Sequence, residues 1–216
     1  MTSTTKQLIV LFSVSLLGII AYLLITSELD KKRKVEVLKT LSVTTLYPIH
    51  KPIGKFSLNH EVDDKPSAFT HKSIQGKWHL FFMGYTSCPH ICPTEMANLT
   101  QLYQNIPKQL QEKIQIIMVT TDPLKDTPSV LKKFVKKFHN DFIGLSGTEV
   151  QIKGFAKQFS MPFLPSKETD KTKQYEVNHS ATFYLTTPTG ELFALYNAPH
   201  DVEKITTDIS LILSEI

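Results

Sequence analysis

The fold of this chain is decided by one stretch, Lys77-Trp-His-Leu-Phe-Phe-Met-Gly-Tyr-Thr-Ser-Cys-Pro-His-Ile-Cys-Pro-Thr94. Its first half, Trp78 to Tyr85, is an apolar run rich in aromatic residues, which predicts a buried strand. A short loop follows, and then both cysteines of the protein, Cys88 and Cys92, arrive at the start of a predicted helix. Backbone N–H groups at a helix N-terminus stabilise a thiolate, so this junction favours thiol or soft-metal chemistry.

The composition is that of a globular protein with one main domain. The chain has 216 residues, of which 41% are hydrophobic and 20% charged. Its net charge of +4 comes from lysines spread along the length, without the arginine and aromatic pattern of a nucleic-acid surface. We therefore expect no nucleic-acid partner. Two cysteines in a chain of this length form either one bridge or one reactive site.

The N-terminal segment predicts a transmembrane anchor. No charged residue occurs from Gln7 to Ser27, and this apolar segment is long enough to span a bilayer. A cleaved signal peptide is the alternative, but no small-x-small cleavage site follows and the apolar run exceeds a usual signal-peptide core. The predicted organisation is a short tail 1–6, an anchor 7–27, a connector 28–49 and a domain 50–216.

Basic residues flank both ends of this predicted anchor. Lys6 precedes it, whereas a cluster from Lys31 to Lys34 follows it. By the positive-inside rule, this distribution would keep the C-terminal domain in the cytoplasm. The charge count alone therefore opposes an extracytoplasmic domain.

The elements predicted after residue 50 imply an α/β fold. They are strands 56–62, 67–70, 78–85, 115–120, 142–145, 180–186 and 191–196, and helices 93–105, 128–139, 149–159 and 201–216. Thr127 is predicted to cap the helix that begins at Pro128. The order implies a mixed central sheet with helices on both faces, which is the thioredoxin-like plan. In such a sheet the reactive loop lies at the C-terminal end of the central strand.

The two cysteines form the motif Cys88-Pro-His-Ile-Cys92-Pro. A thioredoxin oxidoreductase has two residues between its cysteines, and the wider spacing here allows either a disulfide or two thiolates on one metal ion. Two buried, inert cysteines are the alternative. Because proline and a helix start favour reactivity, we expect an exposed loop with reactive thiols.

Two sulfur atoms alone are a poor ligand set, so a third donor is needed. The chain has eight histidines, and His179 is the candidate because it directly precedes a strand predicted to neighbour the central one. We interpret His79 as a packed strand residue and His139 as a cation at a helix end. His90 is interpreted as an exposed loop residue, with a spare ligand as the alternative. Two thiolates and one imidazole suit Cu(I), or Cu(II) with an added ligand, whereas zinc would require a fourth ligand or water.

Three motifs in the same order resemble the Sco/SenC family. They are Gly84-Tyr-Thr-Ser-Cys-Pro-His-Ile-Cys-Pro-Thr94, Val119-Thr-Thr-Asp-Pro-Leu-Lys-Asp-Thr-Pro128 and Val177-Asn-His-Ser180. Members of that family are membrane-anchored, thioredoxin-like copper proteins that help deliver copper to the binuclear copper centre of cytochrome c oxidase. Their domain lies outside the cytoplasm, on the periplasmic face of the inner membrane in bacteria. The resemblance implies the same fold, copper cargo, oxidase partner and location here.

The resemblance also implies which residues form the site. The copper ligands of the family fall on Cys88, Cys92 and His179. The acidic position after the third strand falls on Asp122, which is implied as a supporting residue. A turn former before Pro123 is the other interpretation of Asp122.

Two positions depart from the family pattern. Lys125 stands where arginine is common, and Asn178 stands where an aspartate commonly precedes the ligand histidine. The second change removes a charge beside a predicted ligand, which leaves the tuning of that ligand open. Neither change affects a ligand itself.

Two main functions are compatible with these residues. A copper metallochaperone needs all three ligands, whereas a thiol–disulfide oxidoreductase acting on an oxidase subunit or another extracytoplasmic protein needs only Cys88 and Cys92. Peroxidase chemistry would need one cysteine of low pKa, and a purely structural interaction domain would need none. We interpret the chain as a copper chaperone rather than an enzyme, with thiol–disulfide exchange as the alternative.

Overall fold

The computed structural model describes residues 3–161 and 181–216, with side chains described for 15–47, 51–161 and 181–216. The chain divides into two compact units, one formed by 1–41 with 215–216 and the other by Ser42–Ser214. Among the described residues, no helix has a stretch long and apolar enough to cross a membrane. The side chains of residues 7–14, which belong to the predicted anchor, lie outside the described part.

One helix, α1 (Ser3–Thr40), continues through most of the predicted connector. Residues 28–40 of the predicted connector are therefore helical. The reason is local, since these residues are mainly lysine, glutamate, leucine and valine without glycine or proline. Lys31 pairs with Glu28, and Lys39 with Glu36, at the spacing that supports a solvated helix.

The second unit is built on a six-stranded sheet in the order β1-β8-β7-β4-β5-β6. Its strands are β1 (Thr45–Pro52), β4 (Trp78–Gly84), β5 (Ile114–Thr120), β6 (Ile143–Leu145), β7 (Phe183–Thr186) and β8 (Glu191–Tyr196). Strand β4 is parallel to β5 and antiparallel to β7, and all of its residues are buried. The predicted mixed sheet with β4 at its centre is confirmed.

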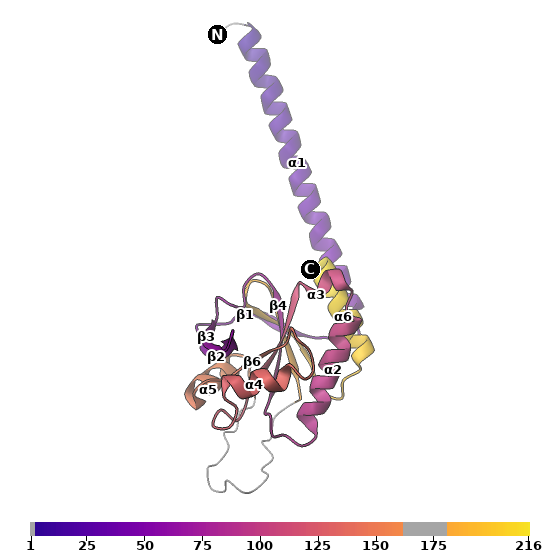
Figure 1. The fold of residues 1–216 in the computed structure, drawn as a ribbon. Coiled ribbons are helices and arrows are strands. Elements are labelled where there is room, and N and C mark those ends of the chain that lie inside the picture. The colour runs from indigo at the N-terminus through magenta and orange to yellow at the C-terminus, as the bar shows by residue number, and fades with distance from the viewer. Residues whose placement is uncertain (1–2, 162–180) are drawn as a thin grey trace. The chain divides into compact units, whose positions relative to one another are not determined.

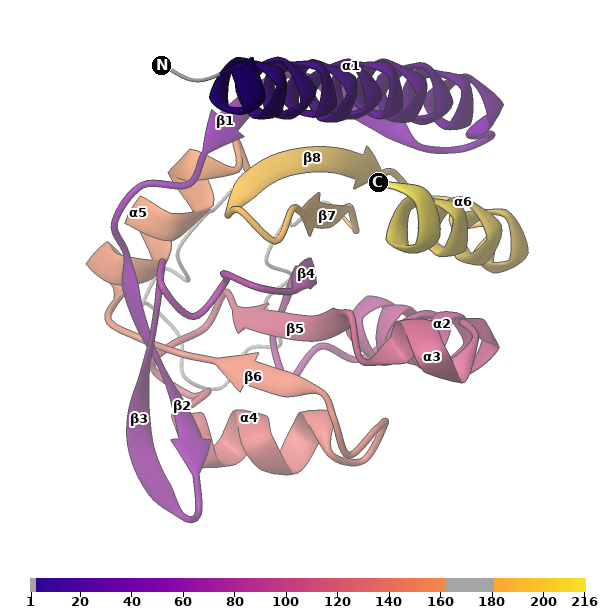
Figure 2. The same cartoon turned by 90° about the horizontal axis from the view of Figure 1, so that it is seen from above.

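Helices cover both faces of this sheet, as Figures 1 and 2 show. One face carries α2 (Ile91–Asn105), the short α3 (Lys108–Gln111) and α6 (Val202–Glu215). The other carries α5 (Glu149–Gln158) and the hairpin of β2 (Ser57–Val62) and β3 (Lys65–Thr70), while α4 (Pro128–Val135) lies beside β6. Side chains alternate between the two faces of a strand. Phe81 of β4 and Val119 of β5 share the face that carries α5, and they belong to one core cluster with Phe155 of that helix.

Strand β1 differs from the sequence prediction, which placed the start of the domain at residue 50. It pairs antiparallel with β8, with Thr45 opposite Leu195 and Pro52 opposite Glu191. A sequence with prolines does not predict a strand, because proline has no backbone N–H to donate within a sheet. Proline is nevertheless tolerated in a strand at the edge of a sheet. The compact unit therefore begins at Ser42.

Helix α4 confirms the predicted cap but is shorter than expected. The hydroxyl of Thr127 accepts a 3.3 Å hydrogen bond from the backbone N–H of Val130, and Pro128 occupies the first turn. The helix ends at Val135 rather than near His139, and turns follow.

Candidate metal centre

The two cysteines meet at the start of α2. His90 is the N-cap residue, so Cys92 falls in the first turn, where backbone N–H groups lack intrahelical partners. The N–H of Cys92 donates a 3.3 Å hydrogen bond to Sγ of Cys88. Neither cysteine forms a disulfide, and this contact joins the backbone of one predicted ligand to the sulfur of the other.

Both thiols are more buried than the sequence predicted. Cys88 is 7% exposed and Cys92 fully buried, so the loop between them is exposed as expected but the two thiols themselves are not. The reason is the glycine at the end of β4: a Cβ atom on Gly84 would lie only 2.9 Å from Sγ of Cys92. Because glycine has no side chain, the sulfur of Cys92 can pack directly against the strand. The neighbouring residues His90 and Ile91 are exposed.

The environment shifts the two thiol pKa values in opposite directions. Burial favours the neutral thiol of Cys88, but hydrogen bonds from Cys92, the His90 backbone and the Tyr85 side chain outweigh it and lower the pKa. Burial raises the pKa of Cys92, and its neighbours Cys88 and Asp126 add to that rise. The predicted effect of the helix N-terminus is therefore seen at Cys88 and not at Cys92.

Asp126 anchors the cysteine loop, a role that the sequence interpretation did not assign. Its carboxylate is fully buried and accepts hydrogen bonds from the N–H and the hydroxyl of Thr86, at 3.0 and 2.5 Å, and from the hydroxyl of Thr120, at 2.7 Å. Burial raises its pKa, and the nearby charge of Asp122 contributes. Because β4 and β5 are parallel, their C-terminal loops lie at the same edge of the sheet, where Asp126 joins them.

Asp122 lies in the tight turn after β5. Its backbone carbonyl accepts hydrogen bonds from the N–H groups of Lys125 and Asp126, at 3.2 and 2.9 Å, so its role as a turn former is confirmed. Its side chain is fully buried, while that of Lys125 is exposed. The supporting role of Asp122 toward a metal stays a prediction.

The third predicted ligand, His179, lies outside the described residues, as do Asn178 and Ser180. The strand that it precedes is confirmed as the neighbour of the central strand, since β7 pairs antiparallel with β4. Within the described ranges, no three histidine, cysteine or carboxylate side chains converge as a metal site would require. The role of His179 as the third ligand stays a prediction.

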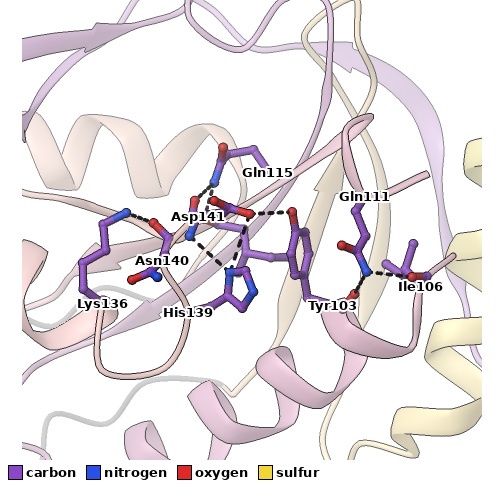
Figure 3. A network of polar contacts seen from close by, with 9 residues as sticks. Tyr103, Ile106, Gln111, Gln115, Lys136, His139, Asn140 and Asp141 are labelled. Carbon is purple, nitrogen blue, oxygen red and sulfur yellow. Dashed lines mark hydrogen bonds and ion pairs between the residues drawn. The ribbon is translucent and has the colours of Figure 1, made fainter. Parts of the chain in front are cut away.

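A separate polar network lies at the opposite end of β5 and accounts for His139 (Figure 3). The imidazole Nδ1 of His139 accepts a 3.1 Å hydrogen bond from the N–H of Asp141, and its ring packs on Tyr103. The hydroxyl of Tyr103 donates to Asp141 at 3.2 Å. Burial, together with this carboxylate, raises the pKa of Tyr103 to about 12. His139 therefore fastens α2 to the loop before β6 instead of completing the last turn of α4.

His79 confirms its interpretation as a packed strand residue. It is 3% exposed, and its ring stacks on Phe81. Burial lowers its pKa to about 4. Its position near the start of β4 places it at the opposite end of that strand from the cysteine loop.

Comparisons with known proteins agree with this geometry. The SCO1/SenC family model matches residues 50–214. The mitochondrial protein SCO2 of Saccharomyces cerevisiae is 32% identical over 183 residues, which cover 83% of this chain and 60% of the yeast protein. The chain thus spans less than two thirds of the length of that relative.

Two solved structures extend the likeness to three dimensions. Yeast Sco1 with copper bound has a TM-score of 0.66 at 28% identity, over 74% of this chain and 86% of that one. BsSco has a TM-score of 0.61 at 26% identity, and the match covers 79% of this chain and 98% of BsSco. It is described as a member of the Sco family of cytochrome c oxidase assembly proteins with a disulfide switch. On the family match, the shared sheet and the cysteine motif on α2, this chain belongs to the SCO1/SenC family.

Proposed function

We propose that this protein is a copper metallochaperone that binds copper through Cys88, Cys92 and His179 and passes it to the copper centre of cytochrome c oxidase. The observation that carries the proposal is the 3.3 Å hydrogen bond from the Cys92 N–H to the Cys88 sulfur, which places two cysteines that form no disulfide side by side at a helix start. Thiolates and imidazole form a soft donor set that suits copper. The copper-bound relative with the same fold supports this choice of cargo.

Both thiols must lose their protons when they bind the metal. Cys88 does so readily because hydrogen bonds outweigh burial and lower its pKa, whereas burial keeps the Cys92 proton in place. Copper uptake should therefore release a proton from Cys92 and become tighter as pH rises. Transfer to a partner would proceed by exchange of ligands.

The test is an anaerobic copper titration of the purified full-length protein beside Cys88→Ala, Cys92→Ala and His179→Ala. We expect one tightly bound copper per chain in the wild type and its loss in all three variants. Tight binding that survives in His179→Ala would show that the proposed ligand set is wrong. The exposed His90, replaced by alanine, is the matched control and should leave the stoichiometry unchanged.

Thiol–disulfide exchange on an oxidase subunit is the second candidate. It is favoured by the opposite pKa shifts of Cys88 and Cys92, because exchange needs one ready thiolate and one thiol that responds later. The disulfide switch described for BsSco belongs to a relative with the same fold. Loss of copper binding only in the cysteine variants, together with a readily exchanged disulfide, would favour this function.

We also propose that residues 7–27 anchor the protein in a membrane and that the domain lies on the extracytoplasmic side. The apolar length of that segment supports the anchor, and the family resemblance supports the side. The basic cluster from Lys31 to Lys34 opposes it. A C-terminal reporter that is active only in the cytoplasm would overturn the proposed orientation.

A further inference from the structure

The side chain of His200 forms a buried polar link between α2 and the β7–β8 hairpin. It is fully buried, and its Nδ1 lies 2.7 Å from Oε2 of Glu95, whose side chain is 11% exposed. Its Nε2 lies 3.1 Å from the backbone carbonyl of Tyr196, at the end of β8. Its ring stacks on Phe183, the first residue of β7, with 3.9 Å between ring centroids and an interplanar angle of 10°.

The hydrogen-bond partners define the protons of this link. A carbonyl only accepts, so Nε2 of His200 carries a proton. The contact between Nδ1 and the Glu95 carboxylate needs one more proton, whichever of the two groups holds it. The pair is therefore neutral as a whole, and both ring nitrogens of His200 have hydrogen-bond partners, as a buried imidazole requires. Asn98 also donates to Oε2 of Glu95, at 3.1 Å, and fixes this carboxylate on α2.

The link contacts the helix that contains Cys92 and the strand that begins four residues after His179 in the sequence. Glu95 follows Cys92 by three residues in the first turns of α2. Phe183 begins the strand that follows His179 by four residues. The imidazole of His200 therefore joins the helix that contains Cys92 to the strand that follows His179 in the sequence.

We propose that Glu95 and His200 form a positioning pair for the metal centre, which sets the first turn of α2 and Cys92 against the start of β7. This inference rests on the proposed copper-binding function. Neither residue contacts the metal in this proposal, and both act through Cys92 and the strand after His179. Residues that hydrogen-bond directly to a metal ligand commonly change metal affinity by about 10- to 100-fold when they are replaced, and this pair acts one step further from the metal.

Three variants test the pair. His200→Phe keeps the aromatic stack on Phe183 but removes both hydrogen bonds. Glu95→Gln keeps the volume and removes the charge. The double variant Glu95→Leu with His200→Phe removes both polar partners together, so that no charge is left buried and the fold is preserved. His79→Phe is the matched control, because it replaces another buried histidine in the same unit at the other end of β4.

The measurements are the thiolate-to-Cu(II) charge-transfer band, the rate of copper loss to a chelator, and the alkylation rate of Cys92 in the metal-free protein. We expect His200→Phe and the double variant to shift the band, release copper at least about tenfold faster and expose Cys92 to alkylation. Glu95→Gln should have a smaller effect in the same direction, and His79→Phe should match the wild type.

The alternatives give distinct results. If the pair only stabilises the fold, the variants lower the unfolding midpoint but keep the band position, the copper release rate and the Cys92 reactivity of the wild type, and the proposal is overturned. Equal changes in His79→Phe would overturn it as well. A wild-type protein that binds no copper would overturn the proposed function itself, together with the positioning role that rests on it.

Discussion

Gly84 and the sulfur of Cys92 are so close that no side chain fits between them: a Cβ atom on Gly84 would lie 2.9 Å from that sulfur. The same Cβ would lie 2.9 Å from Cε1 of Phe82 and 3.1 Å from Cε of Met118. The position of the second thiol therefore depends on a glycine at the end of the central strand.

Gly84→Ala should lower the free energy of unfolding by about 1 to 3 kcal/mol, because the added methyl group overpacks this contact. It should also displace Cys92 and weaken copper binding. Urea unfolding and copper titration measure the two effects. Gly154→Ala is the control, since its Cβ meets nothing within 4 Å on α5 and alanine favours a helix by about 0.5 to 1 kcal/mol. Equal stability changes of the same sign in both variants would contradict the packing argument.

The two cysteines should react at different rates. In the reduced, metal-free protein near neutral pH, iodoacetamide should modify Cys88 first, because hydrogen bonds outweigh burial and lower its pKa, whereas burial raises the pKa of Cys92. Mass spectrometry after timed quenching identifies the modified residue. In urea the two rates should become similar. Faster reaction of Cys92 in the folded protein would refute this order.

Replacement of Asp126 should loosen the cysteine loop. Asp126→Ala removes the acceptor for both donors of Thr86 and for the hydroxyl of Thr120, and we expect a loss of about 2 to 3 kcal/mol of stability. Alkylation of Cys88 should become faster because the loop that precedes it loses its anchor. Asp126→Asn keeps part of the hydrogen bonding, so its stability and its Cys88 alkylation rate should lie between those of the wild type and Asp126→Ala. A fully stable alanine variant with unchanged alkylation would argue against the anchor.

Acid should destabilise the fold through His79. Its pKa is lowered by burial from 6.5 to about 4, so the unfolded chain binds a proton below pH 6.5 that the folded chain does not take up until about pH 4. Stability should thus fall as pH decreases through this window, by about 3 kcal/mol in total. Urea unfolding between pH 7 and pH 4 measures the slope. His79→Phe should be less pH-dependent than the wild type, and identical slopes would rule out this residue as the cause.

The carboxylate of Asp208 holds the segment that leads into β1. It accepts hydrogen bonds from the backbone N–H groups of Ser42, Val43 and Thr44, at 2.9 to 3.0 Å, and from the hydroxyls of Ser42 and Thr44. Burial favours the neutral acid, but these donors outweigh it and lower the pKa.

Asp208→Asn should therefore cost about 2 kcal/mol or more and speed hydrogen exchange at residues 42–44. Urea unfolding and exchange measured by NMR provide the two readouts. Asp201→Asn is the control, because that carboxylate is exposed and pairs with Lys204 on the surface. Protected amides at 42–44 in Asp208→Asn would show that other contacts hold the segment.

The part of the fold near the cysteines was predictable because its signals are local. The apolar run of β4, the cap at Thr127 and the helical spacing of α2 each lie within a few consecutive residues. The cysteine motif likewise predicted that both cysteines lie at a helix start, which is confirmed by the position of Cys92 in the first turn of α2 and by its backbone contact with Cys88.

The contacts that the sequence did not reveal join distant residues. Glu95 and His200 are 105 positions apart in the sequence, and Ser42 and Asp208 are 166 positions apart. No local sequence pattern can therefore predict that either pair forms a hydrogen bond. The burial of Cys92 was missed for a related reason, since it depends on how closely α2 approaches Gly84. In β1 the sequence signal was opposed by proline, and only pairing with β8 makes that segment a strand.

That pairing has a consequence for solubility. β1 covers the side of β8 that does not face β7, and two residues of β8, Leu192 and Ala194, are fully buried. A shortened protein that begins after Pro52 would leave the backbone groups of β8 open along that side. Open hydrophobic strand edges recruit strands from other molecules, so such a truncation should aggregate. β1 thus prevents β8 from pairing with a strand of another molecule.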